Sequence, residues 1–264
     1  MHPGKWAQAV RHFFPNLIGF PKYFFAHPQF ALKLFMARTR YFFTRRLEHP
    51  ITTSDQFLIE DTEELVSYWS FFIERECRSR EWVNALLSTK EPAIVDVGAN
   101  AGLFTHWVWT LRPETKFIVF EPLPKMAEKI ASWGKTTGAA LTLYSKAVSD
   151  YSGMATFYAS ADNDVTASLK PDGDKHTQLD VPVVTLDSII PPMAVVMLKI
   201  DVEGAECEVL AGAKSTLERT EFLLVEAHTE AALRRIQSQL TPKWQSKKVG
   251  ASDYLFSRVS PGSA

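Results

Sequence analysis

A glycine-containing run near the middle of the chain is the first place where the sequence indicates ligand chemistry. A mostly apolar stretch that starts at Ile94 leads into Gly98, Asn100 and Gly102, and helix-forming residues follow from Leu103. Glycine lets the backbone adopt conformations closed to other residues and lets a ligand approach closely. The first turn of a helix adds unpaired N–H groups. The run therefore predicts a strand, a tight turn and a helix that cradle a cofactor.

A carboxylate follows the next predicted strand. That strand, 116–120, ends at Glu121 and Pro122. Ligands of open parallel sheets bind at the carboxyl ends of the strands. We therefore expect Glu121 to lie beside the glycine turn and to accept hydrogen bonds from the hydroxyl groups of a ribose.

Two polar residues share one face of the predicted strand 195–201. The two-residue period of a strand puts Lys199 and Asp201 on one side and their apolar neighbours on the other. A lysine is costly to bury unless it is paired, so we expect Lys199 to pair with Asp201 or Glu226. The pair could be purely structural, or it could belong to a catalytic site, for which Asp201 at the strand end is the better candidate.

Strand 221–228 ends in a similar way, with Glu226 and His228 on one face. Histidine titrates near neutral pH, so His228 is a candidate general base. Asp201, Glu226 and His228 could instead bind a divalent metal, because hard oxygen ligands suit magnesium; a site without metal is the prediction. Glu203, at the turn after the preceding strand, is a candidate substrate contact.

The alternation of strand and helix patterns from residue 93 onward indicates how these residues are positioned. It predicts an α/β fold with a parallel sheet covered on both faces. Strands are expected near 93–98, 116–121, 141–148, 195–201 and 221–228, with helices near 102–112, 124–135, 204–218 and 229–240, and two more strands at 244–249 and 253–259.

An insertion interrupts the alternation between the third and fourth parallel strands. Residues 153–158 and 181–187 have strand patterns, and the polar stretch 160–180 joins them. We expect the inserted segment 153–187 to form a lid over the site.

The N-terminal part of the chain differs in composition from the rest. Residues 1–48 hold eight lysines and arginines against one acid, interleaved with twelve aromatic residues. This mixture suits a peripheral membrane contact, but equally a helical cap packed on the domain or on a second subunit. An amphipathic helix that covers the sheet is predicted to start at Asp61, where Glu64 completes a capping-box pattern.

The overall composition narrows the function classes. A formal net charge of −1 over 264 residues gives no indication of nucleic-acid binding. Two cysteines, Cys77 and Cys207, are too few for a disulfide or zinc framework, so a reducing compartment is expected. No cleavable signal is evident, and no apolar run reaches the roughly 20 residues of a membrane span. We expect a cytoplasmic protein, with membrane association and homo-oligomer formation left open.

Six sequence blocks fall in one order and together carry a family resemblance. They are Asp-Val-Gly-Ala-Asn-Ala-Gly (96–102), Phe-Glu-Pro-Leu-Pro (120–124), Ala-Val-Ser-Asp (147–150), Thr-Leu-Asp-Ser (185–188), Leu-Lys-Ile-Asp-Val-Glu-Gly-Ala-Glu (198–206) and Val-Leu-Ala-Gly-Ala (209–213). In this order they strongly resemble the FkbM family of S-adenosylmethionine-dependent methyltransferases over residues 93–228.

The resemblance implies a fold, a domain division and a cofactor. The fold is that of class I methyltransferases, a Rossmann-like, mostly parallel seven-stranded sheet with an antiparallel C-terminal hairpin. Residues 61–264 would form this domain and residues 1–60 a helical extension. The cofactor would be S-adenosyl-L-methionine, and the residues implied to bind it are Asp96, Gly98, Asn100, Gly102, Glu121, Pro122, Lys146, Ala147 and Asp201. A partial match to the family's lid motif implies substrate contacts from Thr166 and Ser168.

The activity implied is O-methylation of a hydroxyl group on a small molecule, such as a sugar, a glycan or a related natural product. The candidate catalytic residues are Asp201, Glu226, His228 and Lys199. A non-catalytic cofactor-binding adaptor that acts through the N-terminal arm remains an alternative. A nicotinamide-dependent oxidoreductase fits less well, because Asn100 replaces the glycine that would admit a pyrophosphate and Leu103 replaces the one that allows close helix packing.

Overall fold

The computed structural model describes residues 32–37, 50–53, 56–69, 77, 79–160, 163–168 and 176–259. These residues divide into two units, and the second begins at Cys77. Most of the basic and aromatic N-terminal segment, and the predicted helix beyond Trp69, lie outside the described residues.

The described residues of the first unit form one antiparallel pair of short strands and two helical segments. Strand β1 (Ile51–Thr52) pairs with β2 (Leu58–Ile59), helix α4 spans Thr62–Trp69, and residues 32–37 are also helical. The predicted start of α4 is confirmed, since Oδ1 of Asp61 accepts a 2.9 Å hydrogen bond from the amide of Glu64. The Glu64 carboxylate in turn accepts from the amide of Glu60 at 2.7 Å, one residue earlier than in a standard capping box.

The second unit is built on a seven-stranded sheet. Its order is β12 (Trp244–Lys248), β13 (Asp253–Arg258), β11 (Thr220–Glu226), β10 (Val195–Ile200), β3 (Ala93–Val97), β4 (Lys116–Phe120) and β5 (Leu141–Tyr144). The neighbours from β11 to β5 pair in parallel, whereas β13 runs antiparallel to both β11 and β12. This is the mostly parallel sheet with an antiparallel C-terminal hairpin that the sequence predicts.

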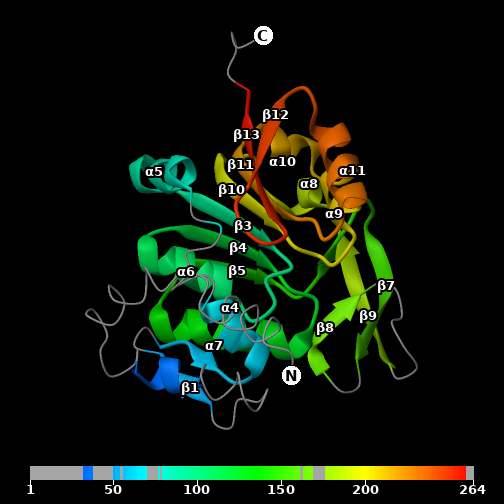
Figure 1. Ribbon diagram of the computed structural model, residues 1–264. Helices are drawn as coiled ribbons and strands as arrows, with labels where there is room; N and C mark the ends of the chain where they lie inside the picture. The colour runs from blue at the N-terminus through cyan, green and yellow to red at the C-terminus, as the bar shows by residue number, and fades with distance from the viewer. Residues whose placement is uncertain are drawn as a thin grey trace, which may run out of the picture. The chain divides into compact units, whose positions relative to one another are not determined.

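Helices cover both faces of this sheet, and Figure 1 shows α6 and α7 on the opposite side from α8 to α11. All residues of β3 and β10 are buried, as expected for central parallel strands packed on both faces. Helix α5 packs against α6 through Trp82 and Trp107, whose ring centroids are 5.5 Å apart. The helices are α5 (Arg80–Ser88), α6 (Leu103–Leu111), α7 (Pro124–Thr137), α8 (Leu186–Ile189), α9 (Glu206–Ala211), α10 (Lys214–Glu218) and α11 (Glu230–Leu240).

The order of the strands fixes where a ligand can bind. From β3 the chain moves outward through β4 to β5, and it later returns to the other side of β3 to form β10 and β11. The carboxyl ends of β3 and β10 therefore flank a switch point, where the loops diverge and leave a crevice. Val97 ends one of these strands and Ile200 ends the other.

The inserted segment forms a second sheet of four strands in the order β6 (Ala147–Val148), β9 (His176–Val184), β7 (Gly153–Ser160) and β8 (Asn163–Ser168). Strand β7 is antiparallel to both β8 and β9, and β6 pairs in parallel with β9. In Figure 1 the strands β7, β8 and β9 lie beside the larger sheet. The short β6 follows β5 along the chain and joins the insertion to the main domain.

Several elements differ from the sequence prediction. The strand expected at 141–148 is split into β5 and β6, which belong to different sheets. The polar stretch expected to join two inserted strands contains β8 and the first residues of β9. The helix expected at 204–218 is broken into α9 and α10 at Gly212 and Ala213, whose backbone angles leave the helical range. The close approach of the Ser149 carbonyl oxygen, 2.1 Å from where a Cβ atom would lie, leaves room only for glycine at position 212. Helices α5 and α8 were not predicted.

Candidate active site

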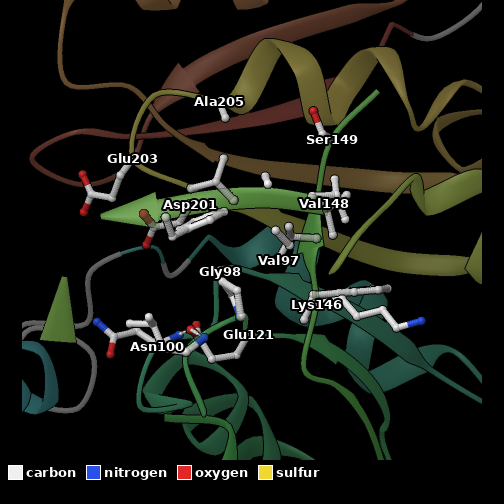
Figure 2. A pocket seen from close by; sticks show the side chains of 18 of the residues that line it. Val97, Gly98, Asn100, Glu121, Lys146, Val148, Ser149, Asp201, Glu203 and Ala205 are labelled. Atoms are coloured by element: carbon white, nitrogen blue, oxygen red, sulfur yellow. Dashed lines mark hydrogen bonds between the residues drawn. The ribbon is translucent and has the colours of Figure 1, made fainter. Parts of the chain in front are cut away.

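A pocket lies at the switch point between β3 and β10. Figure 2 shows Gly98, Asn100 and Glu121 along one side of it and Asp201 opposite them, while Glu203 and Lys146 lie toward different ends. The ends of β3, β4 and β10 thus all contribute residues to the pocket lining, as the parallel arrangement requires. The lining residues are Val97, Gly98, Asn100, Phe120, Glu121, Pro122, Leu123, Lys146, Ala147, Val148, Ser149, Tyr151, Ala155, Phe157, Val183, Asp201, Val202, Glu203 and Ala205.

The glycine turn has the geometry that its residue types predict. Gly98 has φ of 74° and Gly102 has φ of 80°, both in the left-handed region that favours glycine. A Cβ atom at Gly98 would lie 1.8 Å from the carbonyl oxygen of Asp201, and one at Gly102 would lie 2.8 Å from Ile130. The turn can pass between β10 and α7 only because these two positions lack side chains.

Glu121 is fastened to the glycine turn. Its Oε2 atom accepts a 2.7 Å hydrogen bond from the amide of Asn100, and its Oε1 atom accepts a 2.9 Å bond from the amide of Leu123. Burial raises the pKa of Glu121 to about 7, although both amide bonds oppose that rise. The carboxylate lines the pocket and keeps lone pairs for further hydrogen bonds.

Lys199 is a buried lysine of β10 whose ammonium contacts three oxygen atoms. Its ammonium lies 3.1 Å from Oδ2 of Asp201, 3.4 Å from Oδ1 of Asp96 and 3.2 Å from the carbonyl oxygen of Gly98. Burial lowers the pKa of Lys199, but the carboxylates of Asp201 and Asp96 outweigh burial and raise it above its usual value. The predicted pairing of Lys199 with Asp201 is therefore present.

A second polar group lies at the Glu203 end of the pocket. Nε2 of His228 is 3.2 Å from Oε2 of Glu226 and 3.3 Å from Oε2 of Glu203. Although burial opposes it, the pKa of His228 is raised by these two carboxylates. Ser252 donates a 2.7 Å hydrogen bond to Oε1 of Glu226.

The pKa values of Glu226 and Asp201 are shifted in opposite directions. Burial, together with a hydrogen bond to Asp201 and repulsion by its charge, raises the pKa of Glu226 to about 8. Burial also acts against the charge of Asp201, but Lys199 outweighs it and lowers the pKa of that carboxylate. Of these two carboxyl groups, Asp201 is therefore the one that loses its proton first as the pH rises.

The same end of the pocket has side chains suited to a divalent cation. Ligand atoms of Glu203, Glu226 and His228 all lie within 4.8 Å of one another. The sequence prediction combined Asp201 with Glu226 and His228, whereas the structure brings Glu203 into that group. Two carboxylates and an imidazole are acceptable ligands for several first-row metals.

The inserted segment, which was expected to form a lid, supplies pocket residues that the sequence analysis did not single out. Ala155 and Phe157 of β7 and Val183 of β9 line the pocket, together with Tyr151 from the loop before β7. The two-residue period of β7 places Ala155 and Phe157 on one face, and this pattern could have indicated that they share a surface. Which face meets the pocket depends on how β9 pairs with β6, and the sequence does not reveal that pairing.

The predicted site residues fall into three groups. Among the predicted cofactor contacts, those that line the pocket are Gly98, Asn100, Glu121, Pro122, Lys146, Ala147 and Asp201. Asp96 and Gly102 lie behind the turn. Three predicted catalytic residues are not in the lining but contact residues that are or that lie next to it: Lys199, Glu226 and His228. The predicted substrate contact Glu203 lines the pocket, while Thr166 and Ser168 belong to β8, whose side chains lie outside the described residues.

Residues 96–241 match the family model described as the methyltransferase FkbM domain. This match covers more than half of the chain. The chain belongs to the FkbM methyltransferase family. The matching model describes a methyltransferase domain, and the family implies S-adenosylmethionine as the methyl donor.

One curated protein similar to this chain is the 2-O-methyltransferase NoeI of Sinorhizobium fredii (strain NBRC 101917 / NGR234). It is 27% identical over 161 residues, which cover 54% of this chain and 65% of the relative. The aligned part is thus slightly less than two thirds of the relative's length.

Solved structures similar to this FkbM chain include two methyltransferases. The precorrin-6y C5,15-methyltransferase of Geobacter metallireducens GS-15 has 14% identity and a TM-score of 0.41, covering 69% of this chain and 86% of its own. A SAM-dependent O-methyltransferase of Thermotoga maritima has 10% identity and a TM-score of 0.41, covering 81% of this chain and 79% of its own.

No helix among the described residues is both long and apolar enough to cross a membrane.

Proposed function

We propose that this chain transfers a methyl group from S-adenosylmethionine to a hydroxyl group of a sugar, a glycan or a related natural product. The observation that carries the proposal is the pocket where the glycine turn, Glu121 and Asp201 meet, with Glu203 at one end. The similarity to NoeI, which is named as a 2-O-methyltransferase, supports oxygen as the acceptor atom.

The pocket residues fit the proposed cofactor. At Gly98 the backbone lies so close to Asp201 that no side chain could be present, which suits a cradle for an extended amino-acid group. Each oxygen of Glu121 accepts one amide bond and can still accept a ribose hydroxyl. Lys146 and Ala147 would lie along the adenine. When bound, the cofactor supplies a methyl group on a positively charged sulfur.

The acceptor hydroxyl must lose its proton as the methyl group is transferred. We assign this proton to the imidazole of His228, next to Glu203 at the edge of the pocket. The carboxylates of Glu226 and Glu203 stabilise the imidazolium that forms, and they account for its raised pKa. Asp201, which lines the pocket, is assigned both a contact with the cofactor and the orientation of the acceptor.

The rest of the catalytic effect comes from positioning. Holding two reactants in line can supply roughly 7–11 kcal/mol. In this proposal the wall formed by Phe157 and Val183 excludes water from the reacting groups. Thr166 and Ser168 on the neighbouring β8 are proposed to contact the acceptor and to close over it as a lid.

Calorimetric titration with S-adenosylhomocysteine, with NAD as the control ligand, tests the cofactor. Binding of the first alone, at micromolar strength, is expected, and transfer of a labelled methyl group to hydroxylated acceptors then tests the activity. Binding of NAD instead would favour an oxidoreductase. Cofactor binding without transfer to any hydroxylated or amino acceptor would favour an adaptor.

A further inference from the structure

Lys199 is enclosed by the domain rather than exposed in the pocket. The residue is only 6% exposed, and its ammonium lies 5.9 Å from the centre of the Phe104 ring. It is not among the residues that line the pocket. A direct contact between this lysine and a bound ligand is therefore not the role that its position suggests.

Asp96 forms an ion pair with Lys199 and, unlike the lysine's other partners, does not line the pocket. The two residues are register partners on the adjacent strands β3 and β10, and Oδ1 of Asp96 lies 3.4 Å from the ammonium. Asp96 is fully buried, and its Oδ2 atom accepts a 2.7 Å hydrogen bond from the hydroxyl of Thr105 on α6. The carboxylate is thereby fixed, and so is the position of its cationic partner.

The other partners of Lys199 both line the pocket. The ammonium donates to the carbonyl oxygen of Gly98 at 3.2 Å and to Oδ2 of Asp201 at 3.1 Å. Gly98 belongs to the glycine turn after β3, and Asp201 follows the end of β10. One buried cation therefore ties together the two sides of the switch point.

We propose that Lys199 is a positioning residue that, held by Asp96, fixes the glycine turn and the Asp201 carboxylate in the arrangement that binds the cofactor. The proposal rests on the proposed function, because it concerns the same pocket. Lys199, a candidate catalytic residue of the sequence analysis, and Asp96, a predicted cofactor contact, would then both act through Gly98 and Asp201.

A purely structural ion pair makes a different prediction from a positioning residue. Removing one member of a buried pair leaves an uncompensated charge and destabilises the fold strongly, whereas removing both members together is often nearly neutral. If the pair is purely structural, the double variant should therefore recover both stability and ligand affinity. If Lys199 is a positioning residue, the double variant should recover stability but not ligand affinity, because Gly98 and Asp201 would still lack their donor.

The experiment compares Lys199→Met, Asp96→Asn and the double variant by thermal unfolding and by calorimetric titration with S-adenosylhomocysteine. Lys199→Met alone should lower the Tm by roughly 10 °C. The double variant should regain most of that loss, while its affinity stays roughly tenfold or more below that of the wild type. Asp96→Asn, which keeps the bonds of Lys199 to Gly98 and Asp201, should lose much less affinity than the double variant.

Lys243 and Glu218 provide a matched control. They form an exposed ion pair at 2.6 Å on the same domain, so Lys243→Met with Glu218→Gln should change neither the Tm nor the affinity appreciably. Recovery of full affinity in the Lys199→Met, Asp96→Asn double variant would overturn the positioning role and leave the methyltransferase proposal intact. Failure of the wild-type protein to bind S-adenosylhomocysteine would overturn both.

Discussion

The amide of Asn100 donates a 2.7 Å hydrogen bond to the carboxylate of Glu121, which joins the glycine turn to the acid after the next strand. The two residues are 21 positions apart in the sequence and follow adjacent parallel strands. Asn100 has φ of 50°, which a non-glycine residue adopts only with some strain. The bond to Glu121 helps to hold this conformation and points the carboxylate along the pocket.

Replacement of Glu121 by alanine should weaken S-adenosylhomocysteine binding by roughly 1–3 kcal/mol, which is the value of hydrogen bonds to a charged group. Isothermal titration calorimetry measures the loss. Glu128→Ala on the exposed surface of α7 is the control, since it removes the same side chain outside the pocket. Unchanged affinity in a folded Glu121→Ala protein would contradict the assignment of Glu121 to the ribose.

The affinity for S-adenosylhomocysteine should increase as the pH rises from about 6 to about 8. Burial raises the pKa of Glu121 to about 7, with Lys199 opposing and Asp96 reinforcing the rise. Two hydroxyl donors favour the ionised carboxylate, so binding below that pH must release a proton. Titrations in buffers with different ionisation enthalpies measure the released proton, and Glu121→Gln should abolish its release.

The same shift makes the unliganded domain less stable as the pH rises. Glu121 has a pKa of about 7 in the folded chain, against an ordinary value of 4.5. The folded state therefore binds more protons than the unfolded state between these two values, and the contribution to stability is lost progressively from about pH 4.5 to about pH 7. Urea unfolding of the wild type and Glu121→Gln, compared across this range, isolates the contribution.

Replacement of Gly98 by alanine should abolish cofactor binding and lower stability by roughly 1–3 kcal/mol, because the new Cβ atom would overlap the carbonyl oxygen of Asp201. Gly138→Ala is the matched control. Gly138 has a similar φ of 70°, but nothing lies within 4 Å of a Cβ atom there, so only the backbone strain is added. Equal affinities in the two variants would show that the close approach at Gly98 is not needed for the pocket.

The local parts of the site could be predicted from the sequence, and the long-range parts could not. Residues 96–102 contain their own turn, and Glu121 follows from the period of parallel strands. Gly212 looks like an ordinary helix residue until Ser149, 63 positions earlier, is seen to contact its backbone. Strand β8 has a polar sequence without hydrophobic alternation, so neither the strand nor its pairing with β7 could be detected from the sequence.

Asp187 shows that a family motif can have a structural role. Its Oδ1 atom accepts 2.8 Å bonds from the amide and the hydroxyl of Thr216, and its Oδ2 atom accepts from the amide of Ser215 at 2.9 Å. Asp187→Ala should leave the first turn of α10 without these acceptors and lower the unfolding free energy by roughly 1–2 kcal/mol. Chemical denaturation measures the loss. A large fall in cofactor affinity of the folded variant would instead indicate a role in the site.

His228→Ala should lower the turnover far more than the affinity for S-adenosylhomocysteine. The imidazole contacts Glu203 and Glu226 at the edge of the pocket, away from the glycine turn, so its removal should leave Gly98 and Glu121 unchanged. A general base contributes typically 10²–10⁴-fold, and single-turnover methyl transfer measures the loss once an acceptor is known. His228→Gln, which keeps a polar side chain but cannot accept a proton near neutral pH, should be equally slow. Normal turnover in either variant would exclude His228 as the base, and Glu203→Gln would then be the next variant to measure.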